Sequence, residues 1–144
     1  IAKPQDIYDE PVNEFTASFI GNPPINKLSG YIRDQRFVLE DNSAEIRIGN
    51  YAASEGQKVT LAIRAEAITL DNNNYDMTAT IVQRYTMGKE ELAFVRVGEQ
   101  EIRVYLSNDY KYDRGDTVHI RLKNKGIFLF DKESGERIYV KETV

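Results

Sequence analysis

The clearest structural signal in the chain is the segment Thr117-Val118-His119-Ile120-Arg121-Leu122, in which polar and apolar residues alternate. Successive side chains of a β-strand point to opposite faces, so Val118, Ile120 and Leu122 share one face and the polar residues share the other. A strand with this pattern is buried on one side only. The segment therefore predicts one strand of a sheet that covers an apolar core.

Similar segments recur along the chain from Ile25 onward. Short apolar or alternating runs lie at residues 37–39, 45–48, 58–64, 77–85, 92–97, 102–106 and 127–130. Turn residues separate them, at positions 41–43, 55–56, 71–74, 98–99, 114–116 and 133–135. About nine short strands at this spacing are typical of a small antiparallel barrel or sandwich. We therefore expect an all-β fold, in which the polar segment 71–76 could divide the strands into two sub-barrels.

The first 24 residues have a different character. Pro4 and Pro11 precede segments of helical spacing at 5–9 and 12–20, and proline is well suited to the first position of a helix. The run Gly21-Asn22-Pro23-Pro24 ends the helical pattern, because consecutive prolines cannot continue a helix. We expect a short helical segment here. Because the chain starts at Ile1 without an initiator Met or a signal-peptide pattern, we also expect it to begin inside a longer protein.

The amino-acid composition excludes several functional classes for this chain. The chain has 144 residues, a formal net charge of −4 and no cysteine. The lack of cysteine excludes disulfides, thiolate nucleophiles and cysteine-ligated zinc. No apolar run approaches the ~20 residues of a membrane-spanning helix. No basic stripe of the kind that neutralises phosphates is visible, which argues against a nucleic-acid partner.

One stretch superficially resembles a phosphate-binding loop. It runs from Gly21 to Lys27, but the motif requires a Gly directly before the Lys and a Ser or Thr after it. Asn26 and Leu28 occupy those two places. A connection between the N-terminal segment and the strands is therefore the better interpretation.

The remaining candidates for chemistry also lack essential parts. The segment 71–76 offers oxygen ligands, but an EF-hand loop would need Gly where Asp76 stands and Glu where Val82 stands. His119 is the only histidine and has no second His or Cys with which to hold zinc. The nine tyrosines and six phenylalanines are expected mainly in the core, with a stacking platform for a ligand as the alternative. We expect no catalytic, cofactor-binding or metal site, and no enzymatic activity of this chain itself.

A family resemblance starts in the segment Phe15-Thr16-Ala17-Ser18-Phe19-Ile20-Gly21-Asn22-Pro23-Pro24-Ile25-Asn26. It resembles the join between the nucleotide-binding and C-terminal domains of ABC-importer ATPases of the maltose and glycerol-phosphate type. Those proteins carry Phe-Val-Ala-x-Phe-Ile-Gly-x-Pro-x-Met-Asn at this point. The resemblance continues in Leu61-Ala62-Ile63-Arg64-Ala65-Glu66, which is similar to their Leu-Gly-Ile-Arg-Pro-Glu. It extends to Phe128-Leu129-Phe130-Asp131 with the following Ser134-Gly135, which is similar to their last hairpin.

The resemblance implies an OB-like regulatory domain of the TOBE type at residues 25–144, preceded by a helical tail and linker of the nucleotide-binding domain at residues 1–24. In the family this domain holds two ATPase subunits together, which implies a second copy of the subunit as a partner. It also implies permease subunits, contacted through the upstream domain, and a possible regulatory protein. ATP and Mg²⁺ are expected only in the upstream domain. The implied location is the cytoplasmic face of the cell membrane, as a peripheral part of an importer for carbohydrates or glycerol phosphate.

Three residues are candidates for an interface or domain-joining contact: Arg64, Glu66 and Phe130. For Arg64 and Glu66 two interpretations stay open, a local ion pair that closes a strand end and a contact to another domain or subunit. Phe130 belongs to the last hairpin of the resemblance.

Two other functional classes stay open. Related domains in other families bind molybdate or tungstate between protomers, so an oxyanion-binding module is the first alternative. A nucleic-acid-binding OB fold is the second, although it rests on architecture alone.

Overall fold

The computed structural model describes residue 13 and residues 24–87, 90–106 and 111–141. In this part of the chain the secondary structure is almost entirely antiparallel β-strand, which confirms the predicted all-β fold. The helical segment predicted within residues 1–24 lies outside the described residues, apart from Asn13 and Pro24. No helix among the described residues is long and apolar enough to cross a membrane.

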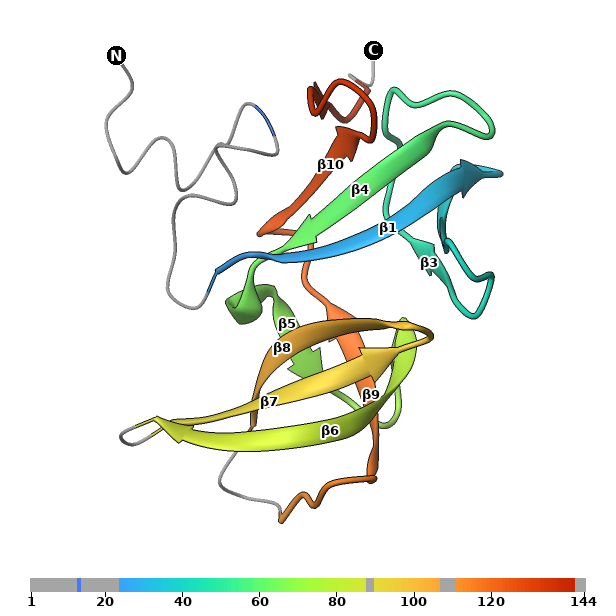
Figure 1. The fold of residues 1–144 in the computed structure, drawn as a ribbon. Coiled ribbons are helices and arrows are strands. Elements are labelled where there is room, and N and C mark those ends of the chain that lie inside the picture. The colour runs from blue at the N-terminus through green and yellow to red at the C-terminus, as the bar shows by residue number, and fades with distance from the viewer. Residues whose placement is uncertain (1–12, 14–23, 88–89, 107–110, 142–144) are drawn as a thin grey trace, which may run out of the picture.

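The described strands form two sheets, which lie one above the other in Figure 1. The first sheet has the order β11–β10–β4–β1–β2–β3. Its strands are β1 (Asn26–Arg33), β2 (Arg36–Leu39), β3 (Glu45–Arg47), β4 (Lys58–Ile63), β10 (Ile127–Asp131) and β11 (Arg137–Ile138).

The second sheet has the order β5–β9–β6–β7–β8. Its strands are β5 (Ile68–Leu70), β6 (Met77–Met87), β7 (Glu90–Val97), β8 (Gln100–Leu106) and β9 (Thr117–Leu122). A register shift between Ile81 and Gln83 bends β6 against β7, because a bulge increases the local twist of a strand. The sheet curls so that its edge strands β5 and β8 contact each other, which produces an OB-like half-barrel.

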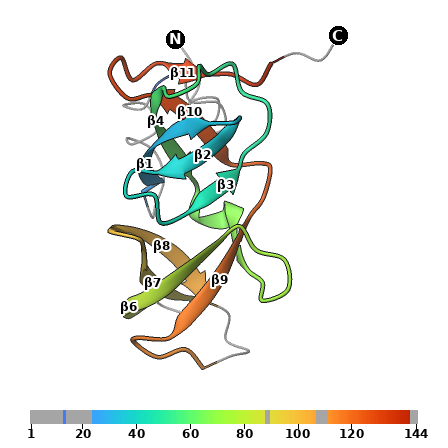
Figure 2. The same ribbon diagram turned by 90° about the vertical axis from the view of Figure 1, so that its right-hand side faces the viewer.

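The second sheet is an excursion between two neighbouring strands of the first. β4 and β10 pair directly with each other, although the whole second sheet lies between them in the sequence. The short 3-10 helix η1 (Ala65–Ala67) carries the chain out, and residues 123–126 bring it back. Figure 2 shows both connections on the same side of the molecule. The segment 71–76 joins β5 to β6 within the second sheet, and its predicted role as a division between sub-barrels stays a prediction.

This neck between the sheets is held by backbone hydrogen bonds. The Arg64 N–H donates to the Gly126 carbonyl at 2.9 Å, and the Lys123 N–H donates to the Ala67 carbonyl at 2.8 Å. Gly126 has a φ of +97°, and a Cβ at this position would lie 3.0 Å from the Cβ of Ala67. Glycine is therefore required where the chain returns to the first sheet.

One continuous apolar core serves both sheets. The alternating pattern of β9 points Val118 and Ile120 inward, as predicted, and both are buried. Leu28 and Ile32 of β1 belong to the same cluster from the side of the first sheet. At about 25 cal/mol per Å² of apolar surface, such burial is the main stabilising contribution to the fold.

Side-chain amides join β1 to β8 across the gap between the sheets. The Asn26 amide donates to the Arg103 carbonyl at 2.7 Å and accepts from the Arg103 N–H at 2.8 Å. In return, the Gln100 amide accepts from the Ser29 N–H at 2.7 Å and donates to the Ser29 carbonyl at 2.9 Å. Each amide thus binds one residue of the opposite strand as a neighbouring strand would. We refer to Asn26, Ser29, Gln100 and Arg103 as the amide clamp.

A second contact joins the sheets at the turn between β7 and β8. The Glu99 N–H donates to Asp41 Oδ2 at 3.0 Å, from the turn that follows β2. A Cβ on Gly98 would lie 2.2 Å from Ser43 Oγ, so only glycine allows this approach. Hydrogen bonds from the Ser43 hydroxyl and N–H, with that of Glu99, hold the pKa of Asp41 below its ordinary value.

The amide clamp predicts the effect of changing Asn26, which is 3% exposed. Asn26→Ala removes both bonds to Arg103, and we expect the free energy of unfolding in urea to fall by about 2 kcal/mol. Asn26→Asp should be at least as destabilising, because it loses the donor and places a carboxylate beside the Arg103 carbonyl. Asn124→Ala, in an exposed turn, is the matched control. Equal stability of the Asn26→Ala and control variants would contradict a stabilising clamp.

The lowered pKa of Asp41 predicts part of the pH dependence of the stability of the fold. Since its pKa is lower in the folded chain, its stabilising contribution is complete above the ordinary pKa and is lost as pH falls through the lowered value. We expect urea midpoints to fall between about pH 5 and pH 2, and to fall less steeply in Asp41→Asn. Glu40→Gln, at an exposed neighbouring position, is the control. Identical acid profiles of Asp41→Asn and the unmodified chain would refute the role of this carboxylate.

Candidate interaction surfaces

The first sheet is buried on both faces around β4 and β10. Leu129 of β10 points into the main core, whereas Phe128 and Phe130 point to the opposite face. There they pack with Ala62 of β4 and with Ile25. We call these four residues, Ile25, Ala62, Phe128 and Phe130, the outer cluster. The continuous apolar run of β10 follows from this position, because a strand covered on both sides has no solvent face.

Two arginines cover one end of the outer cluster. The Cζ atoms of Arg64 and Arg137 each lie 4.9 Å from the centroid of the Phe128 ring. Arg137 also lies 4.6 Å from the ring centroid of Tyr139, whose exposed fraction is 55%. A guanidinium at these distances is attracted to an aromatic face. The pairing lets two cations lie beside an apolar cluster.

The three residues predicted from sequence occupy different surroundings. Phe130 is fully buried, and Arg64 is 7% exposed at the end of β4, so both are parts of the packing around the outer cluster. Glu66 is exposed on η1. Burial raises the pKa of the Tyr105 phenol, and the charges of Glu90 and Glu66 raise it further. Arg64 and Phe130 thus both contact residues of the outer cluster, whereas the charge of Glu66 acts on Tyr105 of β8. Their role in an interface stays a prediction.

Of the residues before Pro24, the structure describes only Asn13, which contacts the first sheet. Asn13 forms an isolated antiparallel bridge with Glu136, in the turn between β10 and β11. The Glu136 carbonyl also accepts from the Asp131 N–H at 2.8 Å. This places residue 13 near the strand that carries the outer cluster.

A second surface lies on the outer face of β6, β7 and β8. Register places Gln83, Phe94 and Arg103 side by side across the three strands. The rings of Tyr85 and Phe94 meet edge to face at 5.3 Å, and the Arg103 Cζ lies 5.0 Å from the Phe94 ring centroid. We call Tyr85, Phe94 and Arg103 the aromatic patch. The sequence pattern, which places aromatic residues mainly in the core, does not predict this patch. The three residues become neighbours only when β6, β7 and β8 pair in this register.

The sequence predicts no metal site in the described residues, and the single histidine lies on a strand face. No group of three or more His, Cys, Asp and Glu side chains among them could hold a metal ion. His119 stacks on Tyr75 with ring centroids 4.4 Å apart, and its Nδ1 lies 3.4 Å from Thr78 Oγ1. These contacts belong to the outward face of β9 and β6.

Comparison with known proteins agrees with the fold and with the resemblance. The TOBE domain family matches residues 61–130, which run from β4 through the whole second sheet to β10. The sn-glycerol-3-phosphate import ATP-binding protein UgpC of Escherichia coli strain K12 is 33% identical over 141 residues, which are 96% of this chain and 40% of that protein. UgpC of Salmonella typhi is 34% identical over the same shares. The chain thus spans about 40% of the length of these relatives.

The matched residues, together with the all-β architecture, define a TOBE domain. Residues 61–130 thus form a TOBE domain, and over 96% of its length the chain is similar to import ATP-binding proteins.

A solved structure shares the fold at lower sequence similarity. The cytoplasmic molybdate-binding protein ModG, in a form with molybdate bound, superposes with a TM-score of 0.58 at 13% identity. The match covers 72% of this chain and 94% of the ModG chain. At this identity the likeness concerns the fold alone.

Thr60 lies on the outer face of the first sheet, and its surroundings predict how its replacement changes the stability of the fold. This residue is 1% exposed, and within the described part of the chain its Oγ1 has no hydrogen-bond partner. Thr60→Val keeps the shape and removes the buried hydroxyl, so we expect unfolding to cost about 1 kcal/mol more. Thr80→Val, at an exposed position of β6, is the control and should change stability little. A loss of stability in Thr60→Val would mean that the hydroxyl is satisfied in solution.

Proposed function

We propose that this chain is the C-terminal regulatory and dimerisation domain of an ABC-importer ATP-binding subunit, for carbohydrates or glycerol phosphate. The observation that carries the proposal is the similarity to import ATP-binding proteins over 96% of the chain. In this function the domain tethers two ATPase subunits on the cytoplasmic side of the membrane. ATP and Mg²⁺ bind to a nucleotide-binding domain outside this chain, which also contacts the permease subunits.

The geometry supports a mechanical role. β1 is the first described strand after the N-terminal segment, and it pairs with both β2 and β4. Through Asn26 and Gln100 it is also bound to β8 of the second sheet. A displacement of the upstream segment is therefore passed to both sheets together. A tether requires this rigidity, because a flexible connection would let the subunits separate without transmitting movement.

The aromatic patch is the surface that we assign to the second copy. A twofold interface must be complementary to itself, so one patch has to offer both partners of each contact. Here Arg103 lies over Phe94, and Arg96 and Glu101 form an ion pair at 3.9 Å beside it. Tyr85 is 39% exposed at its edge. Aromatic and arginine side chains are enriched at the centres of protein interfaces.

Self-association of the 144-residue chain tests the tethering role. In sedimentation equilibrium we expect a reversible monomer–dimer equilibrium that Tyr85→Ala weakens by about tenfold, since buried aromatic anchors dominate interface energies. Tyr139→Ala is the matched control. Tyr139 is more exposed, at 55%, and directly follows β11 in the first sheet, outside the aromatic patch. Monomers at all concentrations, or equal weakening by both variants, would overturn this assignment of the surface.

The coding sequence upstream of Ile1 tests the parent assignment separately. A Gly-x-x-x-x-Gly-Lys-Ser/Thr loop and a Leu-Ser-Gly-Gly-Gln signature in the same reading frame would support an ABC ATPase. A start codon immediately before Ile1 would overturn that assignment. The oxyanion-binding alternative has a different test, in which titration with molybdate would change the oligomeric state or the spectrum of the chain.

A further inference from the structure

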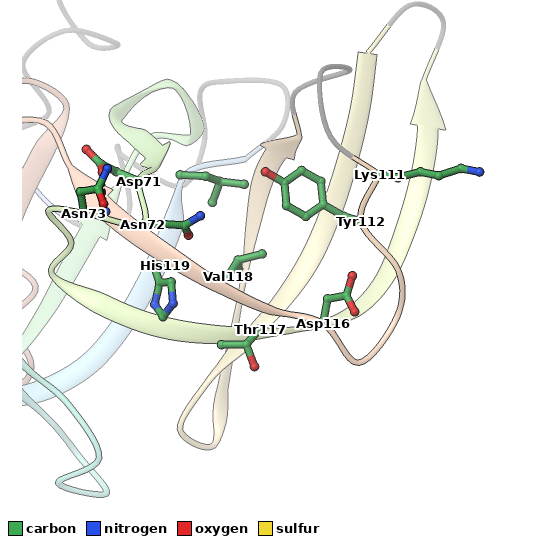
Figure 3. Close-up of a pocket in the computed structure, with 10 residues that line it drawn as sticks. Asp71, Asn72, Asn73, Lys111, Tyr112, Asp116, Thr117, Val118 and His119 are labelled. Carbon is green, nitrogen blue, oxygen red and sulfur yellow. Dashed lines mark hydrogen bonds between the residues drawn. The ribbon is translucent and has the colours of Figure 1, made fainter.

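A groove lies beside β9 at the open end of the second sheet. Its volume is about 550 Å³, within the range of small-molecule sites. Figure 3 shows Asp71 and Asn72 on one side, Tyr112 on the other and Val118 between them. The amide clamp and the aromatic patch contribute no residue to its lining.

The groove exists because β5 is shorter than the strand it pairs with. β5 ends at Leu70, opposite Ile120, and one further bond joins the Asp71 N–H to the His119 carbonyl at 3.0 Å. Backbone groups of alternate residues in a strand point to the same side, so those of Thr117 face the same way as those of His119. No strand residue in the described ranges pairs with Thr117 on that side. The backbone N–H and C=O of Thr117 therefore face the groove.

The groove combines an apolar floor with a polar rim. Val118 is 3% exposed, and Leu70 and Tyr112 pack against the main core. The Tyr112 carbonyl accepts a hydrogen bond from Arg84, which holds this segment against β6. Around the floor stand the exposed polar side chains of Asn72 and Asp116. A ligand with one C–H face and several hydroxyl groups would satisfy both parts of the groove.

The charges of the groove disfavour an anion. Among the lining residues, Asp71 and Asp116 outnumber Lys111, and outside the lining Arg121 forms an ion pair with Asp71 Oδ2 at 3.5 Å. Backbone N–H donors of Asn73 and Asn74 bind Asp71 Oδ1, and the pKa of this carboxyl is lowered mainly for that reason, so it is charged at neutral pH. An oxyanion would approach two carboxylates in this groove.

We propose that this groove binds a small neutral polyhydroxylated solute, of the size of a monosaccharide or disaccharide. Amide, carboxylate and backbone groups at the rim bind its hydroxyls, and the ring of Tyr112 with Val118 packs against its C–H face. The site goes beyond the tethering function and does not depend on it. In a regulatory domain it would couple the concentration of such a solute to the state of the subunit.

NMR titration of the ¹⁵N-labelled 144-residue chain tests the proposal. The neutral probes are glycerol, glucose and maltose, and the anionic probes are inorganic phosphate and sn-glycerol 3-phosphate. We expect a neutral sugar to shift the amide signals of residues 70–73, 111–112 and 117–119, with an affinity that added salt does not change. Shifts confined to other residues, no shift with any neutral probe, or tighter binding of an anion would overturn it.

Two changes at Asn72 sharpen the test. Asn72→Ala removes one hydrogen-bonding group, which should weaken sugar binding about threefold to tenfold. Asn72→Trp fills the groove and should abolish binding. Asn124→Ala and Asn124→Trp, at an exposed turn away from the groove, are the matched controls and should bind as the unmodified chain does. Unchanged affinity in both Asn72 variants, with spectra that show intact folding, would contradict the assignment.

Discussion

The architecture depends on how the unpaired edge of β8 is satisfied where the two sheets meet. Buried backbone N–H and C=O groups cost free energy unless they are hydrogen-bonded. The amides of Asn26 and Gln100 meet this requirement reciprocally, each binding both backbone groups of one residue on the other strand. Two half-closed sheets can therefore share one core without a continuous barrel.

The topology explains why this contact matters. The second sheet leaves the first after β4 and returns before β10, and these two strands pair with each other. Where it leaves and rejoins the first sheet, backbone hydrogen bonds hold the short neck formed by η1 and residues 123–126. The amide clamp and the Asp41 contact with Glu99 give the second sheet two further attachments. These polar contacts add to the shared apolar core, which also packs the two sheets together.

This arrangement separates three surfaces by their physical character. The outer cluster is apolar and already covered within the chain, with Arg64 and Arg137 at its edge. The aromatic patch is partly exposed and suits contact with another protein. The groove beside β9 is concave and polar at its rim. The surface proposed for a second copy and the groove proposed for a solute thus lie at different places in the strand order, apart from the outer cluster.

Much of the fold could be predicted from the sequence, because the inward alternation of β9 and β4 is local. The strand β1 has no clear sequence signal, since its inward positions include Asn26 and Gly30, which carry no apolar side chains. Three features were not visible in the sequence. They are the burial of Phe130, the stacking of Arg64 on Phe128, and the ends of β5 and β9 that form the groove. They depend on register between distant strands, which the chain settles only when it folds.

The sequence by itself determined the class of the fold, the family resemblance and the absence of the motifs required for a phosphate loop. These are patterns of residue type and spacing, and they are readable without coordinates. Only the tertiary structure decided which of the predicted residues are buried and which polar groups form hydrogen bonds with each other. The physical reason is that both depend on strand pairing. Asn26 and Arg103 form hydrogen bonds although they are 77 residues apart in the sequence, and the groove opens where β5 ends at Leu70. Strand pairing joins positions that no local pattern connects.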